Sequence, residues 1–157
     1  MTYVRPHLEF SSPSWSPWLF KDINILEKVQ EKLVKKGLQG KTYNERLLEL
    51  DLLTLADWRT YLDLVETYKI IHGIKNSSPS FFFESTGTGS RRVTRMTGYP
   101  RNVVAQRCKL DIRKNFFTNR VAEPWNDLPS DIKDAPNVNC FKSKSKRFMT
   151  QLHSGRN

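Results

Sequence analysis

Apolar residues recur every three or four positions through three stretches of the first half of the chain, at residues 22–37, 42–50 and 54–73. This spacing is typical of amphipathic helices, in which one apolar stripe faces a core. The third stretch has the longest stripe, formed by Leu55, Trp58, Leu62, Val65 and Tyr68. The first half is therefore predicted to be helical.

Residues that start and stop helices bracket these stretches. The candidate N-caps are Asp22, Thr42 and Thr54. Thr42 and Glu45 also have the spacing of a capping box, in which each side chain bonds the other residue's backbone N–H. Gly37 and Gly73 follow the last turns of the first and third stretches, where glycine readily takes the left-handed conformation. These signals set the expected helix ends.

The pattern changes after residue 75. Residues 76–102 are rich in Ser, Thr, Gly and Pro, which predicts a flexible linker or a long loop. The next stretch, residues 107–113, alternates in character, with Cys108, Leu110 and Ile112 set between Arg107, Lys109, Asp111 and Arg113. A period of two predicts a strand with one apolar and one charged face.

The C-terminal part is predicted to form compact helical pieces. Helical spacing joins Phe117, Val121, Trp125 and Leu128, and Pro124 requires any helix there to be kinked or interrupted. Ser130 is a candidate cap for a short turn, and Asn139 for a last helix. The apolar stripe expected for that last helix is Phe141, Phe148 and Leu152.

Together these patterns predict a mainly α fold with a small β element. A helical subdomain would span residues 1–75, a basic linker or loop residues 76–102, and a basic α+β segment residues 103–157. A chain of 157 residues can form one domain or two small packed subdomains.

Positive charge is concentrated in the second half. Up to Ser80 there are 11 Lys and Arg against 10 Asp and Glu, and from Phe81 onward 15 against 6, so the total of +10 divides into +1 and +9. Such a half-domain attracts polyanions, with RNA or DNA as the first partner class and anionic lipid as the second. A merely basic surface is the alternative.

One run carries most of this excess. Between residues 91 and 120 the only acid is Asp111, and the basic residues are Arg91, Arg92, Arg95, Arg101, Arg107, Lys109, Arg113, Lys114 and Arg120. Phe116 and Phe117 adjoin the run, and aromatic rings among cations can stack on unpaired bases. The alternative is that both rings belong to the core and only the charges face solvent.

No motif for catalysis, metal binding or membrane insertion stands out. Paired aspartates, a Walker loop and a nucleophile elbow are missing, so no cofactor or metal is expected. Cys108 and Cys140, 32 positions apart, are expected to be buried and reduced. No apolar run reaches the ~18 residues of a membrane span, and no signal peptide is evident, which predicts an intracellular protein, nuclear or cytoplasmic.

A short motif near the C-terminus, WNDLP, predicts a structural corner. Trp125 offers a ring to bury, Asn126 can bond a local backbone group, and Pro129 prevents the helix before Leu128 from continuing. This interpretation needs no ligand.

Beyond single motifs, the chain resembles the C-terminal region of non-LTR retrotransposon reverse transcriptases of the LINE type (jockey-like or CR1-like). In that family a Phe-Phe, an Arg-Val, a Trp-Asn-x-Leu-Pro and a later Phe-Lys occur in this order, as they do in RKNFFTNRVAEPWNDLPSDIKDAPNVNCFKSKSKRF. The stretches VRPHLEFSSPSWSPWLFKDINILEKVQ, YNERLLELDLLTL and DLVETYKIIHG resemble its preceding blocks. The resemblance covers about residues 3–152.

The resemblance implies part of the polymerase thumb, with residues 22–73 as its helical framework, followed by a post-thumb segment. The catalytic aspartates, the fingers and the endonuclease of such elements are missing, so the expectation is a non-catalytic fragment. Where the family often has an Arg pair, Trp58 stands before Arg59, which puts a phosphate contact there in doubt.

Two functions stay open at this point. In the first, the chain contacts the backbone of RNA, an RNA–DNA hybrid or DNA, without sequence specificity, through Arg91, Arg92, Arg95, Arg107, Lys109, Arg113 and Lys114. In the second, it is a structural piece that packs against the missing palm and fingers and binds nothing alone. An exposed apolar patch along Tyr3, Leu8, Trp15 and Trp18 would favour the second.

Overall fold

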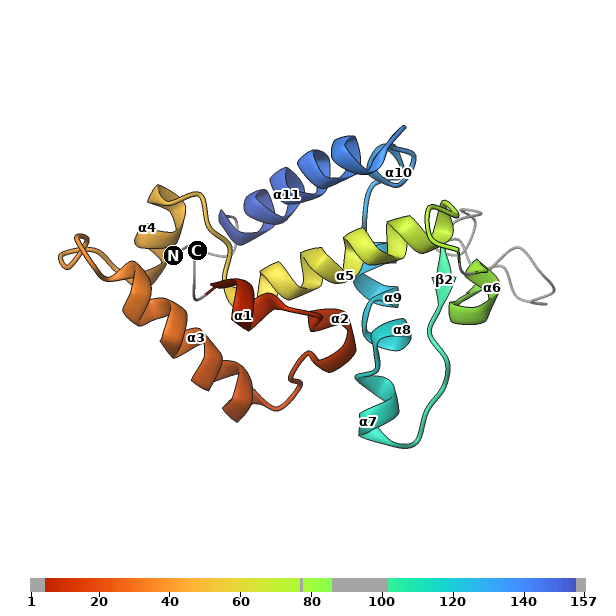
Figure 1. Cartoon of the computed structure of the whole chain (residues 1–157), viewed down its shortest axis with the longest axis horizontal. Coiled ribbons are helices and arrows are strands. Elements are labelled where there is room, and N and C mark those ends of the chain that lie inside the picture. Colours follow the sequence, from red (N-terminus) through yellow and green to blue (C-terminus); the bar gives the residue numbers. More distant parts are fainter. Residues whose placement is uncertain (1–4, 77, 86–101, 155–157) are drawn as a thin grey trace. The chain divides into compact units, whose positions relative to one another are not determined.

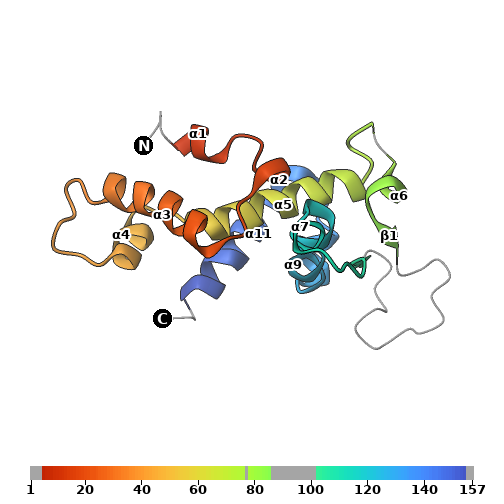
Figure 2. The same ribbon diagram turned by 90° about the horizontal axis from the view of Figure 1, so that it is seen from below.

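A computed structural model describes residues 5–76, 78–85 and 102–154 of the chain (Figures 1 and 2). The described part is mainly helical with one short pair of strands, which confirms the predicted fold class. Its backbone contacts divide the chain into two compact units, residues 1–62 with 146–157, and residues 63–145. This division leaves the three segments expected from the sequence as a prediction.

The first unit contains five helices or parts of helices before residue 63. These are α1 (Arg5–Glu9), α2 (Ser12–Trp15), α3 (Phe20–Val34), α4 (Tyr43–Glu49) and the start of α5 (Leu55–Ile71). The end of α11 (Val138–Ser154) completes the unit. α3 contacts α4 within it.

A partly buried polar cluster joins α3 to the start of α5. Both carboxylate oxygens of Glu27 accept from the Leu55 N–H, at 3.1 and 3.0 Å, and Oε1 also accepts from the Tyr43 hydroxyl. Gln30, 2% exposed, donates to the Tyr43 hydroxyl and to the Leu53 carbonyl, each at 3.0 Å. Burial and Glu27 together raise the pKa of Tyr43 far above its ordinary value. This cluster satisfies backbone groups that α5 leaves open at its first turn.

The helix caps agree with the sequence in two cases out of three. Thr42 and Glu45 form the predicted capping box, and Thr54 accepts from the Asp57 N–H at 3.0 Å. Asp22 is not a cap, because α3 begins two residues before it with Leu19 at the N-cap position. Asp22 instead lies in the first turn, where a carboxylate favours the positive end of the helix dipole.

The second unit carries the remaining elements and the rest of α5. They are α6 (Pro79–Phe82), β1 (Glu84–Ser85), β2 (Val103–Val104), α7 (Asp111–Lys114), α8 (Phe117–Arg120), α9 (Ala122–Asn126), α10 (Ser130–Lys133) and the start of α11. β1 and β2 pair antiparallel, with Ser85 opposite Val103. α7, α8 and α9 follow one another through short turns, and α9 contacts β2 (Figure 1).

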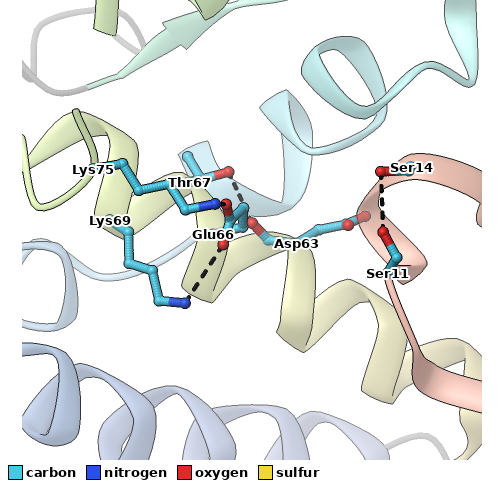
Figure 3. Close-up of polar contacts among 7 residues, drawn as sticks. All are labelled: Ser11, Ser14, Asp63, Glu66, Thr67, Lys69 and Lys75. Carbon is cyan, nitrogen blue, oxygen red and sulfur yellow. Dashed lines mark hydrogen bonds and ion pairs between the residues drawn. The ribbon is translucent and has the colours of Figure 1, made fainter. Parts of the chain in front are cut away.

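The C-terminal half of α5 ends in a turn fixed by charge and by glycine. Gly73 has φ 64°, and the Ile74 N–H reaches back to the Lys69 carbonyl at 2.9 Å, which closes the helix end. Beyond the turn, Lys75 returns to pair with Glu66, which Lys69 also approaches at 3.5 Å (Figure 3). Gly73 therefore ends α5 as predicted.

Aromatic rings form the core of the second unit. Trp125 and Phe141 are fully buried, and Tyr68 is 1% exposed. Tyr68 stacks on Phe141 with centroids 4.3 Å apart, and its hydroxyl donates to the Ala135 carbonyl at 2.6 Å. The ring centroids of Trp125 and Phe141 are 6.0 Å apart. The four positions predicted to share a stripe, Phe117, Val121, Trp125 and Leu128, are all buried, and the helix is interrupted at Val121 between α8 and α9.

The predicted strand at residues 107–113 is wrong. Residues 105–110 form no regular element and α7 begins at Asp111, while Leu110 and Ile112 are 71% and 76% exposed. Alternation favours a strand only where a neighbouring strand pairs with it and a core covers its apolar face, and this segment has neither among the described residues. The β element lies at β1 and β2 instead.

Four smaller predictions also fail, three of them near the C-terminus. Ser130 is the first residue of α10 and gives no side-chain cap. Asn137, not Asn139, caps the start of α11, because the Asn137 side chain accepts from the Cys140 N–H at 2.8 Å. The buried stripe of α11 runs through Phe141, Ser145 and Met149, and Leu152 is 43% exposed. Cys108 and Cys140 are free thiols but only half-buried.

Candidate nucleic-acid interface

The side chain of Asn126 holds the backbone of Val103 in β2, just before the basic part of the second unit; this pair of hydrogen bonds is called the clamp below. Asn126, at the end of α9, accepts from the Val103 N–H at 3.0 Å and donates to the Val103 carbonyl at 2.9 Å. Both backbone groups of Val103 are thus paired by one amide, in the manner of a neighbouring strand. The predicted local bond of Asn126 is wrong, since its partner lies 23 residues away.

A buried lysine joins the same clamp to α10. The Lys133 ammonium donates to the Asn102 side chain at 3.0 Å and to the Asn126 carbonyl at 2.8 Å. Lys133 is 3% exposed, and burial lowers its pKa, against the opposing influence of Asp127 and Asp134. The WNDLP motif is therefore a corner in which Trp125 and Leu128 are buried, Asn126 bonds β2, and Pro129 stands at the N-cap position of α10.

Residues 104–116, called the α7 segment below, run from β2 through α7 to the turn before α8. Asn119 of α8 holds this segment in place by accepting from the Gln106 N–H at 2.9 Å and donating to the Arg113 carbonyl at 2.8 Å. The Arg113 guanidinium in turn donates to the Gln106 side chain at 2.8 Å. No feature of the sequence singled out Asn119, because its partners, two backbone groups and the Cys108 thiol, lie up to 13 residues away.

A buried ion pair anchors α8 beneath the α7 segment. Arg120 donates to both carboxylate oxygens of Asp63 in α5, at 2.7 and 3.0 Å, and to the Asn115 carbonyl at 3.1 Å. Asp63 is 4% exposed; burial raises its pKa, and the bonds from Arg120 oppose that rise. Arg120 belongs to the basic run of the sequence, yet its charge is already neutralised inside the fold.

The remaining cations of the α7 segment point to solvent. Arg107, Lys109, Arg113 and Lys114 are all exposed, against one acid, Asp111. Lys114 pairs with Asp111 at 2.9 Å on the surface, whereas Arg107 and Lys109 have no ionic or hydrogen-bond partner among the described residues. The segment thus presents a net charge of +3, counted as four cations and one carboxylate.

The other predicted contact residues cannot be placed beside these four. Arg91, Arg92 and Arg95 lie outside the described residues. The structure therefore brings together the four cations at residues 107–114, and the contribution of the three arginines stays a prediction.

The two neighbouring phenylalanines differ sharply. Phe117 is 7% exposed and lies in the core, with its centroid 6.0 Å from that of Phe83 and the Arg120 guanidinium 5.9 Å away. Phe116 is 50% exposed and has the Arg113 guanidinium 5.5 Å from its centroid. Of the two open alternatives for this pair, core packing applies to Phe117, while Phe116 is available at the surface.

Metal-binding groups and membrane-spanning helices are absent from the part of the chain that the structure describes. No group of three or more His, Cys, Asp and Glu side chains is placed to hold a metal ion there. None of its helices is both long and apolar enough to cross a membrane.

Comparisons of the chain with protein-family models, with curated proteins and with solved structures find no match.

Proposed function

We propose that this chain is a non-catalytic part of a retrotransposon RNA-directed DNA polymerase, and that it binds the backbone of a template-primer or a target nucleic acid. The observation that carries the proposal is the α7 segment, with four exposed cations against one carboxylate. The ordered motifs that resemble non-LTR reverse transcriptases supply the biological context. An intracellular location, nuclear or cytoplasmic, accompanies the proposal.

The chemistry of the segment suits a phosphate backbone. Each cation that approaches a phosphate releases condensed counterions, so affinity falls as salt rises, with a slope of about −0.9 per contact on duplex DNA. Four contacts correspond to a slope of roughly −3.6 in log K against log salt. Such contacts position a nucleic acid without reading its bases. RNA, an RNA–DNA hybrid and DNA are therefore all candidate partners.

A second candidate function is supported by the first unit. Phe10, Trp15, Trp18 and Phe20 are 79%, 43%, 45% and 78% exposed. Large exposed apolar groups so close in sequence are typical of surfaces that another protein part covers. Trp15 and Trp18 belong to the patch expected for a piece that packs against a palm and fingers, while Tyr3 lies outside the described residues. In this alternative the chain has no binding activity of its own.

Fluorescence anisotropy of a labelled RNA–DNA template-primer, titrated with the protein at several salt concentrations, separates the two. A variant with Arg107→Gln, Lys109→Gln, Arg113→Gln and Lys114→Gln tests the α7 segment. A matched control removes four exposed cations of α3 and the turn that follows it, through Lys28→Gln, Lys32→Gln, Lys35→Gln and Lys36→Gln.

If the proposal is right, the α7 variant binds more weakly and its salt slope becomes less steep by up to about 3.6, while the α3 control changes less. Equal loss in both variants would show that total charge, rather than the α7 segment, governs binding. A folded wild-type protein that fails to bind at low salt would favour the packing function.

A further inference from the structure

Phe116 lies at a junction that turns its ring outward. It occupies the N-cap position of α8 with extended backbone angles, φ −66° and ψ 148°, and its carbonyl accepts from the N–H groups of Asn119 and Arg120, each at 3.0 Å. Neighbouring side chains in extended backbone point to opposite sides, so Phe117 enters the core while Phe116 remains half exposed. The local fold thus holds the ring at the surface.

The backbone beneath this ring is firmly held. Asn119 bonds the carbonyl of Arg113, and Arg120 bonds that of Asn115, at 2.8 and 3.1 Å. Arg120 is itself fixed by Asp63. The ring and the Arg113 guanidinium are therefore presented from a supported turn, which lowers the conformational entropy that a ligand must remove on binding.

Exposure of apolar groups in this segment exceeds what scattered surface residues explain. Leu110, Ile112 and Phe116 are 71%, 76% and 50% exposed within seven positions, and cations stand between them. An apolar partner alone would leave these charges without counterparts, and a phosphate backbone alone would leave the apolar groups in water. A ligand that carries both phosphates and flat apolar faces satisfies both.

We propose that the α7 segment binds single-stranded nucleic acid, with an unpaired base stacked on Phe116 and neighbouring phosphates paired with Arg107, Lys109 and Lys114. The proposal rests on the proposed function and narrows its ligand from any backbone to an unpaired strand. In the interior of a duplex each base is covered by its neighbours on both faces, so a ring at the protein surface can stack there only on a base that is unpaired. Arg113, already over the ring, adds a cation that can contact a base face or a phosphate.

The expected size of the effect follows from measured stacking contributions. Aromatic stacking on one base corresponds to roughly 5- to 150-fold in affinity. Because stacking displaces no counterions, the loss of the ring should leave the salt slope unchanged. A weaker affinity with an unchanged salt slope therefore distinguishes the loss of a stacking ring from the loss of a charged side chain.

The test compares a single-stranded RNA with a blunt duplex that includes the same strand. In both ligands this strand carries a fluorescent adenine analogue. The proteins are the wild type, Phe116→Ala, Phe116→Tyr and a control, Phe81→Ala. Phe81 is 83% exposed in α6 and lies in the same unit, outside the α7 segment. Circular dichroism and thermal unfolding establish that each variant is folded.

We expect Phe116→Ala to weaken single-strand binding at least fivefold, to abolish quenching of the adenine analogue, and to leave duplex affinity and the salt slope unchanged. Phe116→Tyr restores binding because it keeps the ring, and Phe81→Ala behaves as wild type. Equal affinity of Phe116→Ala and wild type for the single strand overturns the proposal, as does an equal loss for single strand and duplex.

The two proposals fail in different ways. If wild type binds both ligands with the expected salt dependence but Phe116→Ala has no effect, stacking is wrong and backbone binding stands. If wild type binds neither ligand, the proposed function is wrong and the stacking inference falls with it; the exposed groups of the α7 segment then belong to a protein interface.

Discussion

Replacement of Asn126 by alanine is the most informative test of how the fold supports the candidate interface. The change removes two bonds, from the Val103 N–H at 3.0 Å and to the Val103 carbonyl at 2.9 Å. Val103 is 4% exposed, so water has poor access to the groups left behind. Each buried group without a partner costs about 1–3 kcal/mol, and partial relaxation of the short strand reduces the sum. The expected loss in the free energy of unfolding is therefore about 2–4 kcal/mol.

Urea denaturation followed by circular dichroism measures this loss. With a slope of about 2 kcal/mol per molar urea, the middle of the usual range, a loss of this size moves the midpoint by roughly 1–2 M. Asn139→Ala is the matched control, since Asn139 is exposed on α11 and its side chain has no bond among the described contacts. Its effect should stay within about 0.5 kcal/mol.

A second substitution at the same position distinguishes lost hydrogen bonds from lost packing. Asn126→Asp keeps the shape and the acceptor but places a carboxylate against the Val103 carbonyl, so it should destabilise the fold at neutral pH. Protonation restores a donor, and the variant should therefore regain stability as the pH is lowered relative to wild type. If Asn126→Ala and Asn139→Ala unfold at midpoints that agree within error, the clamp has no energetic role and the reasoning is refuted.

Three further changes test the core and the buried polar groups. Trp125→Ala should cost at least about 3 kcal/mol in urea denaturation, because the ring is fully buried, and Trp125→Phe should cost less. Arg120→Gln leaves the Asp63 carboxylate buried without its cation and should cost about 3–5 kcal/mol at neutral pH. Burial raises the pKa of Asp63, so the stability that this group contributes is greatest while its carboxyl is protonated and is lost as the pH rises through the folded pKa. The thermal unfolding midpoint of Arg120→Gln should therefore rise as the pH falls. The pKa of Tyr43 is also raised, by burial and by Glu27, so above its ordinary value of 10.0 the unfolded chain ionises first and stability should decline. Burial raises the pKa of Tyr61 as well, so Tyr43→Phe should reduce that decline without removing it, in an alkaline titration followed by tyrosinate absorbance and circular dichroism. A wild-type protein that is equally stable below and above pH 10.0 would contradict the raised pKa of Tyr43.

The candidate interface illustrates which contacts are local in sequence and which are distant. The exposed cations of the α7 segment were expected from the sequence, because charged side chains rarely enter a core without a partner. Arg120 belongs to the same basic run but pairs with Asp63, 57 positions away, and that exception could not be expected from composition. The partner of a buried charge is chosen by the fold, and spacing along the chain does not encode it.

Local patterns alone determined three helices of the first half, α3, α4 and α5, and two of their caps, whereas the short helices α1 and α2 were not predicted. Thr42 with Glu45, and Thr54 with Asp57, act within four residues, so the sequence contains all of the atoms involved. The burial of Trp125 and Leu128 likewise followed from apolar spacing across an interrupted helix. Contacts of short range are readable because the backbone geometry that makes them is itself local.

Only the tertiary structure decided where the segment around residue 110 would lie and which ring would be exposed. Alternation at residues 107–113 resembles a strand, yet a strand requires a partner edge, and Asn126 and Asn119 bond the backbone around it instead. Phe116 and Phe117 are identical in type and adjacent, and their different burial depends on the turn into α8 and on Phe83 and Arg120 around the inner ring. Pairing and burial of this kind depend on residues distant in sequence, which no local period specifies.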